Sequence, residues 1–183
     1  MSAILYYLTL PFIYLLSILP FPLLYGLSNI VYYLLYYVAG YRKEVVLKNL
    51  RYAVPEIIEN ERRSISHRFY RYFCDLFLET FKTLSISRKT MLKHCRLEES
   101  AQQLFDQLAG EHQSIMVVMG HLGNWEWAGN TFSICCQHQL YVIYHPLSNK
   151  YFNGLIIKMR TRFGTKLIPM KDTLREMLNN RKT

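Results

Sequence analysis

Two side chains that can share a proton, His121 and Glu126, lie five residues apart in the stretch Ser114–Trp127, which reads SIMVVMGHLGNWEW. Histidine is the usual general base at physiological pH, because its ordinary pKa lies close to neutrality. A carboxylate that holds the second ring nitrogen sets the tautomer and stabilises the imidazolium. Five residues of one continuous helix turn through about 500°, which places the two side chains on different faces. We therefore expect His121 in a turn before a helix and Glu126 in the first turns of that helix.

The residues around this pair predict the strand, turn and helix that would bring it together. Ile115–Met119 is a short apolar run of the kind that forms a buried strand. Gly120 and Gly123 permit an unusual turn after it, and Asn124 is a suitable N-cap for the helix that follows. A histidine and a glutamate at this spacing often occur by chance, but open α/β sheets place their sites at the carboxyl ends of strands. The position therefore favours a base-and-carboxylate site over a structural histidine.

The string HLGNWE, residues 121–126, resembles the H-x4-[D/E] motif of the lysophospholipid acyltransferase superfamily. More narrowly, it is similar to the lipid A late acyltransferases of the lauroyl/myristoyl type, which carry Glu at its last position. The resemblance covers nearly the whole chain. Its other parts are the basic segment Arg42–Leu50, the amphipathic stretch Arg68–Glu79, the Y-[RK]-P-L-x-N-like segment Tyr144–Asn149, with His145 where a basic residue is usual, and the paired-arginine block Arg160–Gly164.

The resemblance implies an enzyme that moves a fatty acyl group from an acyl thioester, of the acyl carrier protein type, to a hydroxyl of a lipid A precursor-like glycolipid. His121 would take the hydroxyl proton and Glu126 would orient His121, with no cofactor and no covalent acyl-enzyme. Another lipid acceptor (lysophospholipid, phosphoglycolipid or aminolipid) is the alternative substrate class, and a non-catalytic membrane-associated protein is the alternative outside enzymes. The family's domain normally continues further, so we expect a chain that stops at Thr183 to be incomplete at its C-terminus.

Four further residues are candidates for holding the substrates: Gly123, Asn124, Arg160 and Arg162. Backbone N–H groups around Gly123 would hold the oxyanion, and Asn124 either donates to it or caps the helix. Arg160 and Arg162 would point about 200° apart on a continuous helix, so they could not share one phosphate. The alternative for both arginines is a solvated cation. The resemblance favours anion binding, and more for Arg162 than for Arg160.

The first 41 residues contain no Asp, Glu, Lys, Arg or His, and the charges begin at Arg42. Within them, Ile4–Val38 is longer than the roughly 20 residues that cross a bilayer, although three prolines and a glycine interrupt it. We predict a membrane anchor rather than a core helix, either as one kinked span or as a span followed by an interfacial helix. Basic residues directly after it predict that its carboxyl end faces the cytoplasm. With the resemblance, this indicates the cytoplasmic face of a bacterial inner membrane.

The net charge of +9 is unevenly distributed: residues 42–96 carry +7, residues 97–149 carry −5 and residues 150–183 carry +7. Such cations favour an anionic leaflet. Nucleic-acid binding is the competing explanation, but no helix-turn-helix, zinc-finger or RNP pattern supports it, so we expect no nucleic-acid partner. The cysteines show no C-x2-C spacing, which predicts reduced, partly buried thiols and no metal site. They are Cys74, Cys95, Cys135 and Cys136.

Three segments follow from composition: a membrane anchor over 1–41, a basic amphipathic helical segment over 42–96, and the N-terminal part of the α/β catalytic core over 97–183, which forms one domain with 42–96. With the resemblance, the fold class is α/β, an N-terminal membrane-anchoring helix followed by an acyltransferase-type mixed sheet flanked by helices. Besides Ile115–Met119, the expected strands are Leu140–Tyr144 and Lys166–Pro169, and the expected helices are Tyr41–Tyr52, Ile57–Leu84, Ser100–Ala109, Asn124–Cys136, Lys150–Phe163 and Asp172–Asn180.

The longest expected helix, Ile57–Leu84, carries an aromatic stripe in which apolar residues recur at three- and four-residue steps from Phe69 to Leu84. We expect this stripe to pack on the sheet. A groove for an acyl chain, between the stripe and the anchor, is the alternative.

Overall fold

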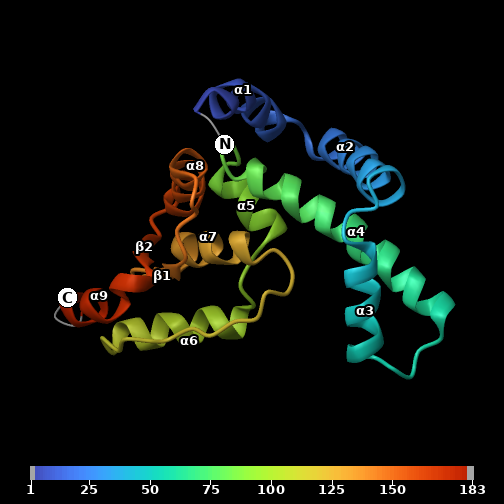
Figure 1. The fold of residues 1–183 in the computed structure, drawn as a ribbon. Helices are drawn as coiled ribbons and strands as arrows, with labels where there is room; N and C mark the ends of the chain where they lie inside the picture. Colours follow the sequence, from blue (N-terminus) through green and yellow to red (C-terminus); the bar gives the residue numbers. More distant parts are fainter. Residues whose placement is uncertain (1–2, 181–183) are drawn as a thin grey trace. The chain divides into compact units, whose positions relative to one another are not determined.

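A computed structural model describes residues 3–180 of the chain (Figure 1). These residues divide into two units. Leu15–Lys82 form the first, here called the helical unit. Residues up to Tyr14 and residues from Thr83 onward form the second, here called the α/β unit.

The charge-free N-terminal segment forms two apolar helices, α1 (Ala3–Ile18) and α2 (Phe21–Tyr33), and the π-helical segment η1 (Leu34–Val38) prolongs α2. Pro20 is the N-cap of α2 and separates it from α1, a position where the missing N–H of proline costs little. Of the described residues, Phe21–Val38 is the one stretch long and apolar enough to cross a membrane, by length and composition alone.

In the helical unit, α4 (Glu59–Lys82) packs against both α2 and α3 (Lys43–Ala53). The centre of this packing is a cluster of buried residues from α2, η1 and α4, in which the rings of Tyr36 and Tyr70 meet edge to face with centroids 5.1 Å apart. This geometry suits the quadrupoles of two aromatic rings. The members of the cluster are Tyr32, Tyr36, Tyr70 and Cys74.

The aromatic stripe of α4 is not buried as the sequence predicts. The buried positions of this helix recur every four residues, at Ser66, Tyr70, Cys74 and Leu78. Tyrosines of α2 and η1 cover this face, so the neighbouring face is left outside the core of the unit. The prediction that the stripe packs on the sheet is therefore wrong for the residues that remain exposed, which are Phe69, Tyr72, Phe73 and Phe77.

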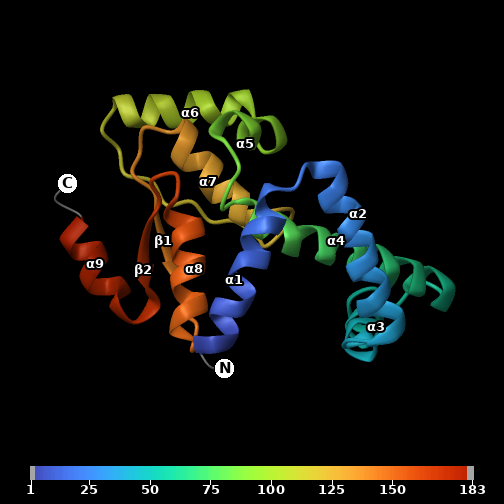
Figure 2. The same ribbon diagram turned by 90° about the horizontal axis from the view of Figure 1, so that it is seen from above.

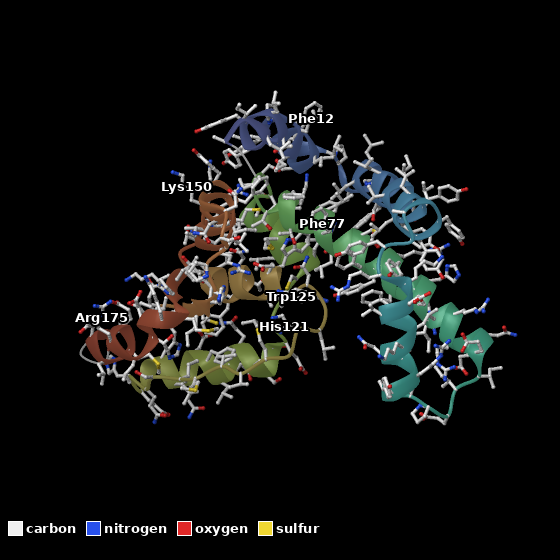
Figure 3. All side chains as sticks on the ribbon, viewed as in Figure 1. Phe12, Phe77, His121, Trp125, Lys150 and Arg175 are labelled. Carbon is white, nitrogen blue, oxygen red and sulfur yellow. The ribbon has the colours of Figure 1, made fainter. Side chains whose placement is uncertain are left out.

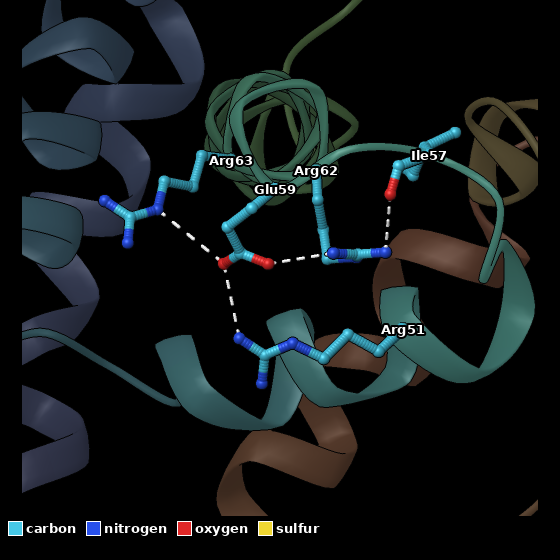
Figure 4. A network of polar contacts seen from close by, with 5 residues as sticks. All are labelled: Arg51, Ile57, Glu59, Arg62 and Arg63. Carbon is cyan, nitrogen blue, oxygen red and sulfur yellow. Dashed lines mark hydrogen bonds and ion pairs between the residues drawn. The ribbon is translucent and has the colours of Figure 1, made fainter.

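A polar network around Glu59 joins α3 to the start of α4 (Figure 4). The Glu59 carboxylate accepts a hydrogen bond from Arg62 at 2.8 Å and one from Arg51 of α3 at 3.2 Å, and the Arg63 side chain lies 3.7 Å away. Arg62 also donates to the carbonyl of Ile57 at 2.8 Å. The hydrogen bond from Arg62 holds the pKa of Glu59 below its usual range.

The α/β unit contains a parallel two-stranded sheet of β1 (Tyr141–Tyr144) and β2 (Lys166–Pro169) (Figure 2). In its register, Tyr141 lies opposite Lys166. The crossover between the two strands is α8 (Lys150–Thr161), as a parallel connection requires. Both strands confirm the prediction, whereas the predicted mixed sheet is not confirmed, because the described sheet has parallel pairing alone. The other helices are α5 (Arg88–His94), α6 (Glu99–Gly110), α7 (Trp125–Cys135), the 3-10 helix η2 (Met170–Asp172) and α9 (Thr173–Asn180).

The core of this unit lies between α7, α8 and β2, where α7 packs on α8 and α8 packs on β2. Trp127 and Phe132 of α7, Leu155 and Met159 of α8, and Ile168 of β2 are all buried. Both helices differ by at most two residues at either end from the predicted ranges Asn124–Cys136 and Lys150–Phe163. The four cysteines are free thiols, as expected.

The strand predicted over Ile115–Met119 is wrong. The chain between α6 and α7 is irregular, and the side chains of Met116 and Val118 are 77% and 87% exposed. An apolar run becomes a strand only when a neighbouring strand pairs with its backbone. In the described residues the sheet consists of β1 and β2, which pair with each other, so this run has no ladder to join.

Candidate active site

The start of α7 has the turn and the cap that the sequence predicts. Gly123 adopts a left-handed backbone conformation, with φ at +62°, which glycine accepts without steric cost. The side-chain oxygen of Asn124 accepts a hydrogen bond from the backbone N–H of Trp127 at 3.1 Å. Asn124 is therefore the N-cap of α7, and Glu126 lies in the first helical turn.

His121 lies in the segment before α7, as expected, and its side chain is exposed. Its ring contacts the ring of Trp125, with centroids 5.0 Å apart and a steep angle between the planes (Figure 3). Among the described residues, the His121 ring makes no hydrogen bond to Glu126. The structure therefore places both candidates at one end of one helix without joining their side chains.

Glu126 is held instead by Arg160 of α8. The Nε of Arg160 donates to one carboxylate oxygen at 2.8 Å, and its Nη2 donates to the other oxygen. The Glu126 side chain is 16% exposed and the Arg160 side chain is 28% exposed, so water reaches this pair only in part. The hydrogen bond to Glu126 raises the pKa of Arg160, which keeps the guanidinium charged. A bidentate pair of this kind fixes the direction of both groups.

Arg162 points elsewhere, as the rotation between the two arginines predicts. Its guanidinium donates to the backbone carbonyl of Thr83, and burial lowers its pKa. The hydroxyl of Thr83 in turn accepts a hydrogen bond from the indole of Trp127 at 3.1 Å. Arg162 thus fastens the end of α8 to the segment before α5. Its predicted contact with substrate stays a prediction.

The comparisons with known proteins can be set against this geometry. The family model described as bacterial lipid A biosynthesis acyltransferase matches residues 1–183. The chain belongs to the bacterial lipid A biosynthesis acyltransferase family. Comparison with curated proteins gave no match, and neither did comparison with solved structures.

The family is one of acyltransferases, and the candidate residues for that chemistry lie at the start of α7. An exposed imidazole precedes the helix, a carboxylate held by a guanidinium follows, and the first backbone N–H groups of a helix are available to anions. In the described residues no group of three His, Cys, Asp or Glu side chains is close enough to bind a metal ion. Sequence reasoning missed the contact between Glu126 and Arg160, although both residues were candidates.

Proposed function

We propose that this member of the lipid A biosynthesis acyltransferase family is a membrane-bound enzyme that transfers a fatty acyl group from an acyl thioester to a hydroxyl of a lipid A precursor-like glycolipid. The observation that carries the proposal is the arrangement at the start of α7. There His121 is open to an incoming substrate, while Glu126 is fixed on the first turn by Arg160.

In the proposed reaction, His121 takes the proton of the acceptor hydroxyl, and the hydroxyl oxygen attacks the thioester carbonyl carbon. The C–S bond then breaks, and the leaving thiolate receives the proton from the His121 imidazolium. The new ester and the free thiol account for all atoms. No protein nucleophile forms a bond to the acyl group, and no cofactor is needed.

Glu126 has the capacity to orient His121 while it remains bound to Arg160. Each carboxylate oxygen has two lone pairs, and the Arg160 hydrogen bonds use one lone pair on each oxygen. Rotation of the exposed His121 side chain toward α7 would let a remaining lone pair accept a ring N–H. Glu126 would then set the tautomer and stabilise the imidazolium.

The negative charge that develops on the thioester oxygen needs hydrogen-bond donors. We assign this part to the backbone N–H groups around Gly123 and the first turn of α7, which agrees with the left-handed turn at Gly123. Asn124 supports these donors indirectly, because its N-cap hydrogen bond fixes the first turn of α7. Arg162 and Arg160 stand as candidate cations for an anionic group of the donor or the acceptor.

The remaining parts of the proposal concern partners and location. The donor is an acyl thioester of the acyl carrier protein type, and the acceptor is a membrane glycolipid. The charge-free helices α1 and α2 and the basic residues after them support attachment to the cytoplasmic face of a bacterial inner membrane.

Two substitutions test the chemistry in membranes that contain the protein. His121→Ala should lower turnover of an acyl thioester by about 10²–10⁴-fold, the usual contribution of a general base. Glu126→Gln should also be severely impaired, because an amide does not stabilise an imidazolium. His112→Asn is a matched control, since His112 is exposed, lies in the same unit and has a φ of +54°, which asparagine tolerates.

Near-normal turnover of either variant would overturn the catalytic assignment. The same assay, run with a lipid A precursor, a lysophospholipid and an aminolipid in competition, identifies the acceptor. Preference for a lysophospholipid or an aminolipid would show that the acceptor belongs to that class and not to the lipid A precursors. Absence of acyl transfer to any of the three acceptors by the wild-type full-length protein would favour the non-catalytic alternative.

A further inference from the structure

Helix α4 carries charged side chains along the length of α2. The Tyr25 hydroxyl of α2 donates to the Glu79 carboxylate at 2.7 Å, and the Tyr32 hydroxyl lies 2.8 Å from Nδ1 of His67. The later residue of α2 thus meets the earlier residue of α4, so the two helices run antiparallel. Figure 1 shows them side by side.

Two more contacts extend this pairing. The Lys82 ammonium donates to the carbonyl of Leu19, just before α2, at 2.6 Å. The guanidinium of Arg71 lies over the ring of Tyr32, 5.2 Å from its centroid. From Leu19 to Tyr32 a helix rises about 20 Å. Charged groups of α4 therefore accompany α2 over most of its length.

This pairing conflicts with a membrane-spanning α2. An upright helix over Phe21–Val38 would cover nearly the whole hydrocarbon core, which is about 30 Å thick. Glu79 and Arg71, which pack on its sides, would then lie inside the core. Charged side chains are expensive there unless they face a water-filled or protein-lined interior.

The two faces of α2 point to a different orientation. The buried positions Leu24, Ser28 and Tyr32 face α4, and Tyr36 of η1 continues this line. With 3.6 residues per turn, the exposed apolar side chains lie on the opposite face of the helix. These exposed side chains are Leu23, Ile30, Tyr33, Leu34 and Tyr37.

We propose that α2 and η1 lie in the plane of the membrane and anchor the helical unit to one leaflet, instead of crossing the bilayer. The exposed apolar face enters the acyl region, and α4 lies on the water side of α2. Lys43, whose ammonium lies 4.0 Å from the Tyr36 ring centroid, and Arg71 are then available to anionic headgroups. The occupant of the apolar face is an anionic lipid leaflet. This inference does not depend on the acyl transfer chemistry.

Depth measurements on the full chain in vesicles of phosphatidylethanolamine and phosphatidylglycerol test this orientation. Nitroxide labels are placed on Leu23→Cys, Ile30→Cys and Leu34→Cys, one at a time, after the four native cysteines are replaced by alanine. We expect the three labels to have the same depth within a few ångström. Arg68→Cys, on an exposed position of α4, is the control and should be reached by a water-soluble relaxation agent.

A spanning helix gives a different pattern. The label at Ile30 would lie near the bilayer centre, about 10 Å deeper than the label at Leu23, and that result would overturn the proposal. Aqueous exposure of all three labels would overturn it as well. Tyr33→Cys and Tyr37→Cys lie on the same face and replace any variant whose circular dichroism differs from that of the wild type.

Discussion

At the residue scale, the ion pair between Arg160 and Glu126 makes a specific prediction. Arg160→Gln removes both hydrogen bonds to the carboxylate, and hydrogen bonds to charged groups are worth about 1.5–3 kcal/mol each. We expect turnover of the acyl thioester to fall at least about tenfold, because Glu126 loses the group that directs it. Arg160→Lys should recover only part of the activity, since an ammonium does not reproduce the planar fork.

Arg162 provides the comparison for this prediction, because it lies at the end of the same helix and donates to the Thr83 carbonyl instead. Arg162→Ala should lower the melting temperature. It should raise KM as well if Arg162 binds an anionic substrate group, as the family resemblance implies. Steady-state kinetics and thermal unfolding of the three variants separate these effects. Unchanged turnover in both Arg160 variants would argue against a role for the pair with Glu126.

Cys136 allows a test of burial in the α/β unit. Desolvation raises the pKa of its thiol to about 11. At pH 8 only about one such thiol in a thousand is ionised, and the thiolate is the reactive form. We therefore expect iodoacetamide to modify Cys136 far more slowly in the folded protein than in urea, as measured by mass spectrometry of the digested chain. Equal rates in both states would contradict the partial burial of Cys136.

The local part of the candidate site was predictable, and its long-range part was not. Gly123 and Asn124 act through their own backbone and the next helical turn, so residue type and order are enough to predict the turn and the cap. The partner of Glu126 comes from α8, which follows β1 in the sequence and is thus separated from α7 by a strand. The Glu126 carboxylate binds Arg160 instead of His121 because of how α7 and α8 pack, and this packing cannot be deduced from the spacing of neighbouring residues.

At the scale of elements, the Glu59 network predicts a dependence of stability on pH. A carboxyl group whose pKa is lowered in the folded state stabilises the fold above its unfolded pKa, and this contribution disappears as the pH falls through the folded pKa. We expect Glu59→Gln to melt below the wild type at neutral pH and to match it at acidic pH. Glu61→Gln, at an exposed position of the same helix, is the control. Equal melting temperatures at neutral pH would contradict the prediction.

Helices and strands differed in how well the sequence predicted them. A helix satisfies most of its backbone hydrogen bonds within itself, so local sequence signals such as the Asn124 cap were enough to predict α7, and α8 was also predicted to within two residues. A strand needs a partner, and Ile115–Met119 has an apolar composition without one among the described residues. The short helix α5 was missed because seven residues contain too little periodicity, although Ser87 caps it by accepting from Thr90.

At the scale of the whole molecule, composition and packing draw different divisions. The charge boundary at Arg42 separates the charge-free residues 1–41 from the charged remainder of the chain. The helical unit nevertheless combines α2, from the charge-free side, with α3 and α4, from the basic side. Composition therefore predicts which segment contacts lipid, whereas the tyrosines of the buried cluster join α2 to α4 and make them part of one unit.

The exposed apolar side chains of the charge-free segment predict how the whole protein is retained in membranes. Leu8 and Phe12 of α1 and Ile30 of α2 are exposed, and burying each such side chain contributes about 1.5–3 kcal/mol. Replacing all three by glutamate should shift the protein from the carbonate-washed membrane fraction to the supernatant, as measured by immunoblot. Gln103→Glu combined with Leu104→Glu, on the exposed face of α6, adds charge elsewhere and should leave retention unchanged. Retention of the triple variant at the wild-type level would show that these side chains do not contact lipid.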